Sequence, residues 1–292
     1  MLMTDLFYHI DEFCKTFENE IRKNSLPTDN FSIPKGALCL SEIMTIEVYF
    51  HYSGYKTFKD YFLKYEIALK QYFPKLTSYS RFTELQQQIL LPMALLARIG
   101  GANKCNEVSF IDSFPLAVCH IKRASGNKTF KDLAKKGKTS VGWFFGFKVH
   151  LVISTKGEII DFCITPGNVA DNNLDVVNKI TQNIVGKLIG DKGYISPKLF
   201  ESLFSRQIKL ITKIRQNMKN KLMDFYEKLL LKKRGLIESV IDILKNSFSI
   251  EHSRHRSPIN FLSNVFSAIV AYSFRLKKPS IHLPLTRLQE LI

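Results

Sequence analysis

The spacing of the apolar residues changes near residue 105, and this change limits the folds that are open to the chain. Before it, apolar side chains recur every three or four residues, as over residues 5–21, which is typical of amphipathic helices. After it, short apolar runs and alternating segments predict β-strands, the first over residues 108–111. We therefore expect an all-helical domain over residues 1–105 and an α/β domain over residues 106–292.

The segments of the second domain follow a definite order. Residues 144–153 and 158–165 alternate apolar and polar side chains on either side of a turn, which predicts a hairpin. Residues 187–190 and 208–214 predict two further strands, with helices between and after them. The expected order is strand, hairpin, helix, strand, helix, strand, helix, which indicates a mixed sheet flanked by helices.

Positive charge is concentrated in this second domain. The formal net charge is +16, yet residues 1–105 carry 12 Lys/Arg against 11 Asp/Glu, and the remaining residues carry 30 against 15. Such a field attracts polyanions, and nucleic acid is the first partner to expect. An anionic membrane surface and a merely lysine-rich composition are the alternatives.

Two basic segments are candidate phosphate contacts. Residues 122–138 contain seven Lys/Arg, and we expect them to form a loop without stable secondary structure. Arg254 and Arg256 form the second segment. A solvated run of charge is the alternative interpretation of both.

Cysteine usage and hydropathy favour a cytoplasmic protein, which binding to nucleic acid would bring to the nucleoid. The five cysteines contain no C-x-x-C pair, so reduced thiols are expected. The N-terminus lacks the basic and then apolar pattern of a signal peptide. The longest apolar stretch, residues 259–274, is interrupted by asparagines and serines, so no membrane span is expected.

Two acids follow short apolar strands. Asp112 ends the sequence Val-Ser-Phe-Ile-Asp, and Asp191 ends Lys-Leu-Ile-Gly-Asp. Ligands gather at the carboxyl ends of strands in open α/β sheets, and carboxylate oxygens suit hard cations. A third acid, Glu238, lies on a polar stripe of a predicted helix. Turn capping by the aspartates and surface ion pairing by the glutamate are the alternatives.

In combination these acids and their neighbours resemble the DDE transposases of bacterial insertion sequences. Three motifs in order carry the resemblance, which covers roughly residues 105–275: Ile111-Asp112-Ser113, Asp191-Lys-Gly-Tyr194 and Arg234-x3-Glu238-x6-Lys245. Leu231 stands where many relatives have a tyrosine. The resemblance implies an RNase H-like fold whose acids lie on the first strand, the fourth strand and a later helix.

The resemblance also implies the chemistry of the site. It implies two Mg²⁺ ions, with Mn²⁺ as a substitute, held by three catalytic carboxylates: Asp112, Asp191 and Glu238. It implies DNA or phosphate contacts from five further side chains: Arg234, Lys245, Tyr194, Lys148 and Lys192. Asp161 and Asp171 are alternative third carboxylates, and His150 is expected to be a structural residue of the sheet.

The implied function is transposition of an insertion sequence by cleavage and strand transfer at its terminal inverted repeats. The implied partner is double-stranded DNA, both element ends and target, with the protein at least dimeric on it. The helical region 1–105 is a candidate for recognising the element ends, with residues 78–81, which open a helix, as its recognition segment. A purely structural role for this helical region is the alternative. A zinc site at His252 and His255 is disfavoured because no cysteine pair accompanies them. An RNase H-like nuclease without strand transfer and a non-catalytic DNA-binding remnant are the competing functions.

Overall fold

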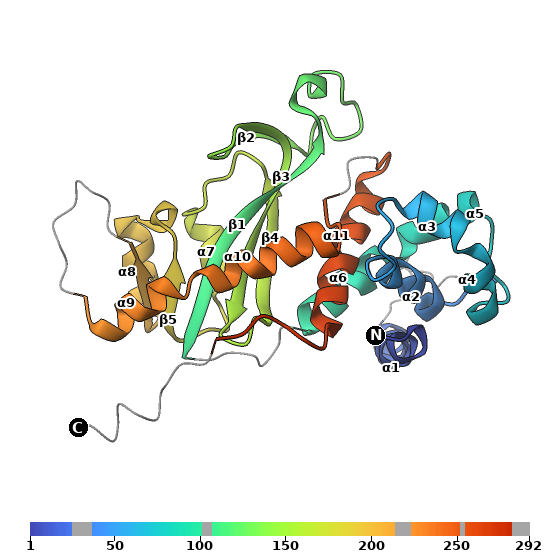
Figure 1. Cartoon of the computed structure of the whole chain (residues 1–292), viewed down its shortest axis with the longest axis horizontal. Coiled ribbons are helices and arrows are strands. Elements are labelled where there is room, and N and C mark those ends of the chain that lie inside the picture. Colours follow the sequence, from blue (N-terminus) through green and yellow to red (C-terminus); the bar gives the residue numbers. More distant parts are fainter. Residues whose placement is uncertain (25–36, 101–106, 214–222, 252–254, 282–292) are drawn as a thin grey trace. The chain divides into compact units, whose positions relative to one another are not determined.

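The computed structural model describes residues 1–24, 37–100, 107–213, 223–251 and 255–281. They form two compact units, each assembled from separate stretches of sequence (Figure 1). The first unit comprises Met1–Gly100, Leu116–Gly146 and Ile243–Leu276; the second comprises the described parts of Gly101–Pro115, Phe147–Asp242 and Lys277–Ile292. The predicted domain boundary lies at residues 101–106, outside the described residues, and it stays a prediction.

The described residues contain one mixed sheet of six strands. The strand order is β2-β3-β1-β5-β6, and β4 also pairs with β3. The strands are β1 (Val108–Cys119), β2 (Lys135–Lys138), β3 (Trp143–Ser154), β4 (Ile159–Pro166), β5 (Gly186–Gly190) and β6 (Ile208–Thr212). β3 is antiparallel to β2 and β4, whereas β1, β5 and β6 run parallel. A mixed sheet flanked by helices is confirmed.

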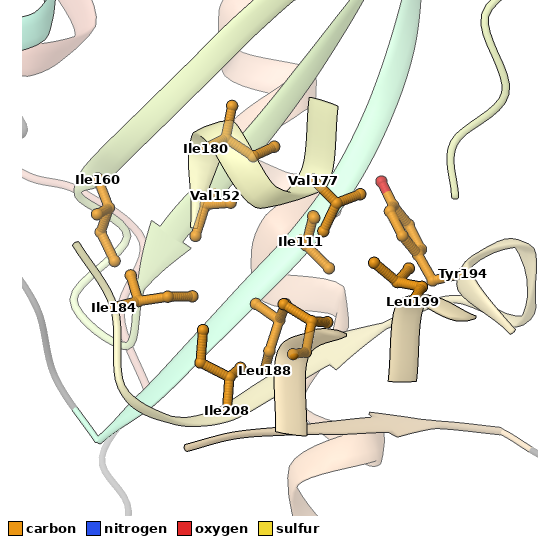
Figure 2. Packing of buried hydrophobic residues seen from close by; sticks show 11 residues of the cluster. Ile111, Val152, Ile160, Val177, Ile180, Ile184, Leu188, Tyr194, Leu199 and Ile208 are labelled. Carbon is orange, nitrogen blue, oxygen red and sulfur yellow. The ribbon is translucent and has the colours of Figure 1, made fainter. Parts of the chain in front are cut away.

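In the second unit, helices α7 (Leu174–Ile180) and α8 (Pro197–Ser205) pack against the sheet. Ile111, Leu188 and Ile208 come from three neighbouring strands and share one buried cluster with Val177 of α7 and Leu199 of α8 (Figure 2). Burial of each such side chain contributes roughly 1.5–3 kcal/mol. This cluster fixes the parts of β1 and β5 that lie next to Asp112 and Asp191.

The sequence specifies where these two helices begin. Asn173 accepts a hydrogen bond from the Val176 backbone N–H at 3.1 Å, and Ser196 accepts one from Leu199 at 3.4 Å. Pro197 occupies the first turn of α8, where its missing N–H costs nothing. Two further helices of the unit follow, α9 (Phe225–Lys232) and α10 (Gly235–Asp242). The two turn residues Lys233 and Arg234 separate them.

The first unit is mainly helical. Its N-terminal helices are α1 (Met3–Asn24), α2 (Leu40–Phe50), α3 (Phe58–Lys64), α4 (Glu66–Tyr72), α5 (Tyr79–Leu85), the 3₁₀ turn η1 (Gln86–Ile89) and α6 (Leu90–Ile99). The C-terminal helix α11 (Pro258–Phe274) packs on α6 and α2. A 3₁₀ turn, η2 (Ile121–Arg123), and a π-helical turn, η4 (Ile243–Ser247), complete the described helices of this unit.

Helix α11 explains the polar residues within the apolar stretch 259–274. Ser267 lies 2.8 Å from the His51 Nε2 atom, and the His51 Nδ1–H donates to the Phe248 carbonyl at 2.5 Å. Asn264 donates to the Ile250 carbonyl at 3.4 Å. These buried polar groups bond inside the helical unit. In the described ranges, no helix has the length and apolar character needed to cross a membrane.

Two strand predictions need correction. β1 extends to Cys119 rather than ending near residue 111. Residues 135–138, expected to be part of a loop, form strand β2 because they pair with residues 143–146 of β3. Lysines are poor strand formers, so this strand depends on cross-strand pairing that local composition does not reveal.

Gly146 tests the close approach of β3 to β1. A Cβ atom at this position would lie 2.0 Å from the Leu116 carbonyl oxygen, which is backbone and cannot rotate away. We expect Gly146→Ala to cost roughly 1–3 kcal/mol or more and to lower the unfolding midpoint by several degrees in differential scanning calorimetry. In Gly126→Ala the nearest atom would be 3.9 Å away, so the midpoint should hardly change. Equal midpoints for the two variants would contradict the close contact.

Candidate active site beside β1 and β5

Asp112 and Asp191 lie across from one another just beyond the last backbone pair of β1 with β5. Asp112 is an internal residue of β1, and Asp191 directly follows β5. β1 and β5 are parallel, with Val108 opposite Lys187 and Phe110 opposite Ile189. The same offset, continued by two residues, puts Asp112 opposite Asp191. Asp191 keeps an extended backbone, with φ −79° and ψ 171°, so the strand direction continues through it. Paired strands lie about 4.8 Å apart, so the two carboxylates belong to one site.

The two negative charges of this pair repel one another. Burial raises the pKa of Asp112, and the negative charge of Asp191 raises it further. The Ser113 backbone N–H, 2.8 Å from Asp112 Oδ1, and the Arg234 guanidinium act in the opposite direction without cancelling the rise. A pair of carboxylates with this balance is stabilised by an added cation.

Arg234 joins Asp112 to Glu238. It lies in the turn before α10, and its Nη1 donates to Asp112 Oδ2 at 2.9 Å while its Nη2 donates to Glu238 Oε1. The side chains of Asp112 and Arg234 are largely buried, whereas that of Glu238 is 56% exposed. The shared guanidinium therefore connects the predicted glutamate, in the first turn of α10, to Asp112.

A second network lies beside the first and was missed at the sequence level. Asp171 accepts hydrogen bonds from the Ser113 hydroxyl at 2.6 Å and from Lys148 Nζ at 2.9 Å. Lys148 also donates to the Val169 carbonyl at 2.9 Å. Burial raises the pKa of Asp171, but these hydrogen bonds and the lysine charge outweigh it, and the pKa lies below its ordinary value. The sequence shows Asp171 only as an alternative third carboxylate, because its partners, Ser113 and Lys148, come from distant parts of the chain.

The positions of Lys148 and His150 follow from the burial of β3. Lys148 is 9% exposed and His150 is fully buried, with Nε2 2.9 Å from the Thr165 hydroxyl. Burial lowers the pKa of His150 to about 4. The histidine is placed as the expected structural residue. The ammonium of Lys148 is directed into the protein, so we no longer assign it to DNA phosphates.

Tyr194 lies in the core rather than on the surface. Its side chain is 1% exposed and belongs to the buried cluster of the second unit (Figure 2). Burial, and then the charges of Asp112 and Asp171, hold the pKa of its hydroxyl well above the ordinary value. The ring therefore anchors the 3₁₀ turn η3 (Lys192–Tyr194) and is not available to stack on DNA. Lys192 is exposed at the start of this turn.

Three further sequence candidates lie among the described residues of the first unit: Lys245, Arg256 and Ser78. Lys245 belongs to η4 and forms an ion pair with Glu251 at 3.7 Å. His252 and Arg254 lie outside the described residues, while Arg256 is exposed. Ser78 caps α5 by accepting a hydrogen bond from the Arg81 backbone N–H at 3.4 Å.

The oxygen donors at the strand ends fit a hard divalent cation. Asp112 and Asp191 supply carboxylates from adjacent strands, and such ligands suit Mg²⁺ or Mn²⁺. Glu238 is connected to Asp112 by way of Arg234, which lies between the two carboxylates. Among the described residues, no three His, Cys, Asp or Glu side chains already converge as a set of metal ligands. The donor chemistry therefore fits, while the side-chain arrangement would have to tighten around an ion.

Comparison with known proteins adds two findings. A family model described as a transposase DDE domain matches residues 102–258, more than half of the chain. The chain is also similar to the piggyBac transposase in a cryo-EM structure of its synaptic complex with hairpin DNA, with a TM-score of 0.51 and 11% identity. That similarity covers 91% of this chain and 71% of the other, and at this identity it shows the fold alone. No curated protein matches.

The Asp171–Lys148 pair generates a prediction about stability. In Asp171→Asn the buried ammonium of Lys148 loses its counter-ion, so we expect a loss of about 1–3 kcal/mol at neutral pH. The lowered pKa of Asp171 means that its contribution is present above the ordinary aspartate pKa and is lost as the pH falls through the lower folded value. Urea unfolding should thus separate the variant from the wild type at pH 7 and bring them together in acid. A constant difference across that range would refute the ionic role.

Proposed function

The chain belongs to the transposases with a DDE domain, and from this premise we propose that Asp112, Asp191 and Glu238 are the catalytic acids with which it cuts and joins DNA. The observation that carries the proposal is the register of β1 and β5, which sets the two aspartates opposite one another. The RNase H-like fold implied by the resemblance agrees with the mixed sheet and with the fold shared with a transposase. Because β2 is an extra short strand, Asp191 follows the fifth strand of the chain rather than the fourth.

Charge compensation supports Glu238 over Asp171 as the third acid. Asp171 has its own buried counter-ion, Lys148, and is held by Ser113. Asp112 and Glu238 instead share the single guanidinium of Arg234, and Asp191 adds a further negative charge to the pair. The strand-end site therefore carries an excess of negative charge that a divalent ion would neutralise.

The three acids would hold Mg²⁺, with Mn²⁺ as a substitute. When bound, such ions activate the attacking oxygen and stabilise the leaving oxygen of a phosphoryl transfer. Arg234 orients Asp112 and Glu238 toward one another, and the exposed Lys192 next to Asp191 is placed to attract a DNA phosphate. Lys245 is retained as a second candidate phosphate contact.

The proposed reaction has two displacements at phosphorus. Water attacks the phosphodiester at the element end and breaks its bond to the 3′ oxygen, which leaves a free 3′-OH and a 5′ phosphate. The 3′-OH then attacks a phosphodiester of the target, forms the new bond and releases the target's own 3′-OH. Neither step requires a covalent bond between enzyme and DNA.

The substrate proposed is double-stranded DNA carrying terminal inverted repeats of an insertion sequence. The net positive charge of residues 106–292 favours such a polyanion. Pairing two element ends requires at least two copies of the protein on the DNA. Inverted repeats in the genomic DNA close to both ends of the gene would supply the sequences needed for an assay.

Strand cleavage by the purified protein tests the catalytic acids. On DNA carrying those repeats, in Mg²⁺, we expect Asp112→Asn, Asp191→Asn and Glu238→Gln each to lower the cleavage rate on the order of 10³-fold or more. Asp242→Asn is the matched control, since Asp242 is an exposed acid one turn beyond Glu238 on the same helix.

Two outcomes would change the proposal. Cleavage by Glu238→Gln at the rate of Asp242→Asn would remove Glu238 from the site. Cleavage without any joined product under conditions that support nicking would favour a nuclease over a transposase.

A further inference from the structure

The hairpin formed by β2 and β3 projects an exposed tip. The two strands pair from Lys135 opposite Gly146 to Lys138 opposite Trp143. Thr139 and Gly142 close the turn, with the Thr139 N–H donating to the Gly142 carbonyl at 2.8 Å. Gly142 has φ +150°, a backbone conformation that favours glycine over residues with a side chain.

The side chains at the tip are of two kinds. Trp143 is 62% exposed and Val141 is 97% exposed, although the next two residues of β3, both phenylalanines, are buried. Lys136 and Lys138 lie on the same face of the hairpin as Trp143, because residues paired across strands face the same side. The Lys138 ammonium lies 5.8 Å from the centre of the Trp143 ring. A large aromatic surface is thus held in water beside two cations.

The chemistry of a partner follows from this combination. An exposed tryptophan and valine are stabilised by a partner that covers them, and the neighbouring lysines select a negatively charged one. Nucleotides supply both features, since each carries a phosphate and a flat base. A paired base in a duplex offers only its edge in the grooves, whereas an unpaired base offers its face.

We propose that this hairpin tip binds unpaired DNA nucleotides, with Trp143 stacking on a base while Lys136 and Lys138 contact the adjoining phosphates. The inference rests on the proposed function, because cutting one strand at an element end frees a 3′ end whose last nucleotides can unpair from the other strand. It assigns a ligand to a surface that the three acids do not explain.

Tryptophan fluorescence gives a direct test, because Trp143 is the sole tryptophan of the chain. The full-length protein is titrated, in EDTA and at fixed salt, with a duplex bearing a single-stranded tail and separately with the same duplex fully paired. We expect the tailed duplex to quench the emission and the paired duplex to leave it nearly unchanged. Equal responses to the two DNAs, no response to either, or a response to protein concentration alone would overturn the proposal.

Variants separate stacking from charge. By anisotropy of labelled DNA, Trp143→Ala should bind the tailed duplex roughly 5- to 100-fold more weakly, and Trp143→Phe should retain most of the affinity. Lys136→Ala should reduce the slope of log K against log salt by about 0.7, whereas Lys156→Ala, at the exposed turn between β3 and β4, should leave it unchanged. Unaltered unfolding midpoints check that each variant is folded. Equal tail affinity of Trp143→Ala and the wild type would refute stacking.

The outcome is independent of catalysis. Quenching by the tailed duplex in a protein that does not cleave DNA would retain the hairpin site and reject the proposed function. Cleavage by a protein whose tryptophan does not respond to either DNA would reject the hairpin site and retain the function.

Discussion

The parallel pairing of β1 with β5 is the constraint on which the proposed site depends. A slip of one residue would turn every side chain of one strand to the opposite face of the sheet. Asp112 and Asp191 would then point to opposite faces. Close packing fixes the register. A Cβ atom at Gly186 would lie 2.4 Å from the Glu107 carbonyl oxygen. The same carbonyl accepts a hydrogen bond from the Lys187 N–H at 2.7 Å. The start of β5 can therefore pack against the start of β1 in only one register.

The acids near the β1–β5 pair have two different basic partners, Lys148 and Arg234. Lys148 neutralises Asp171 within the protein. Ser113, the residue next to Asp112, also donates a hydrogen bond to Asp171. Arg234 donates hydrogen bonds to both Asp112 and Glu238, and so it connects strand β1 to helix α10. The result is a stable internal ion pair beside a group of carboxylates that remains under-compensated, which is the arrangement that a metal-dependent phosphoryl transfer requires.

The sequence predicted the strand-end acids and most of the secondary structure because short apolar runs ending in an acid, the hairpin of β3 and β4, and Ser196-Pro197 are local signals. It did not predict what depends on distant partners. Lys148 lies on the polar side of the alternation in β3 and looked exposed, but both faces of β3 are covered, so its ammonium needs Asp171. Tyr194, which the resemblance assigns to DNA contact, is buried in the core. Strand β2 forms only because it pairs with β3, since its lysines have little strand propensity of their own. Trp143 carries no local signal of exposure next to two buried phenylalanines.

The central claim is that Asp112 and Asp191 hold a divalent cation together, and direct measurement of Mn²⁺ binding by electron paramagnetic resonance tests it without DNA or turnover. We expect the wild type and Asp242→Asn to take up Mn²⁺ with the same affinity, and Asp112→Asn and Asp191→Asn each to lose most of this affinity. Undiminished Mn²⁺ binding by a chain carrying both strand-end substitutions would contradict the central claim.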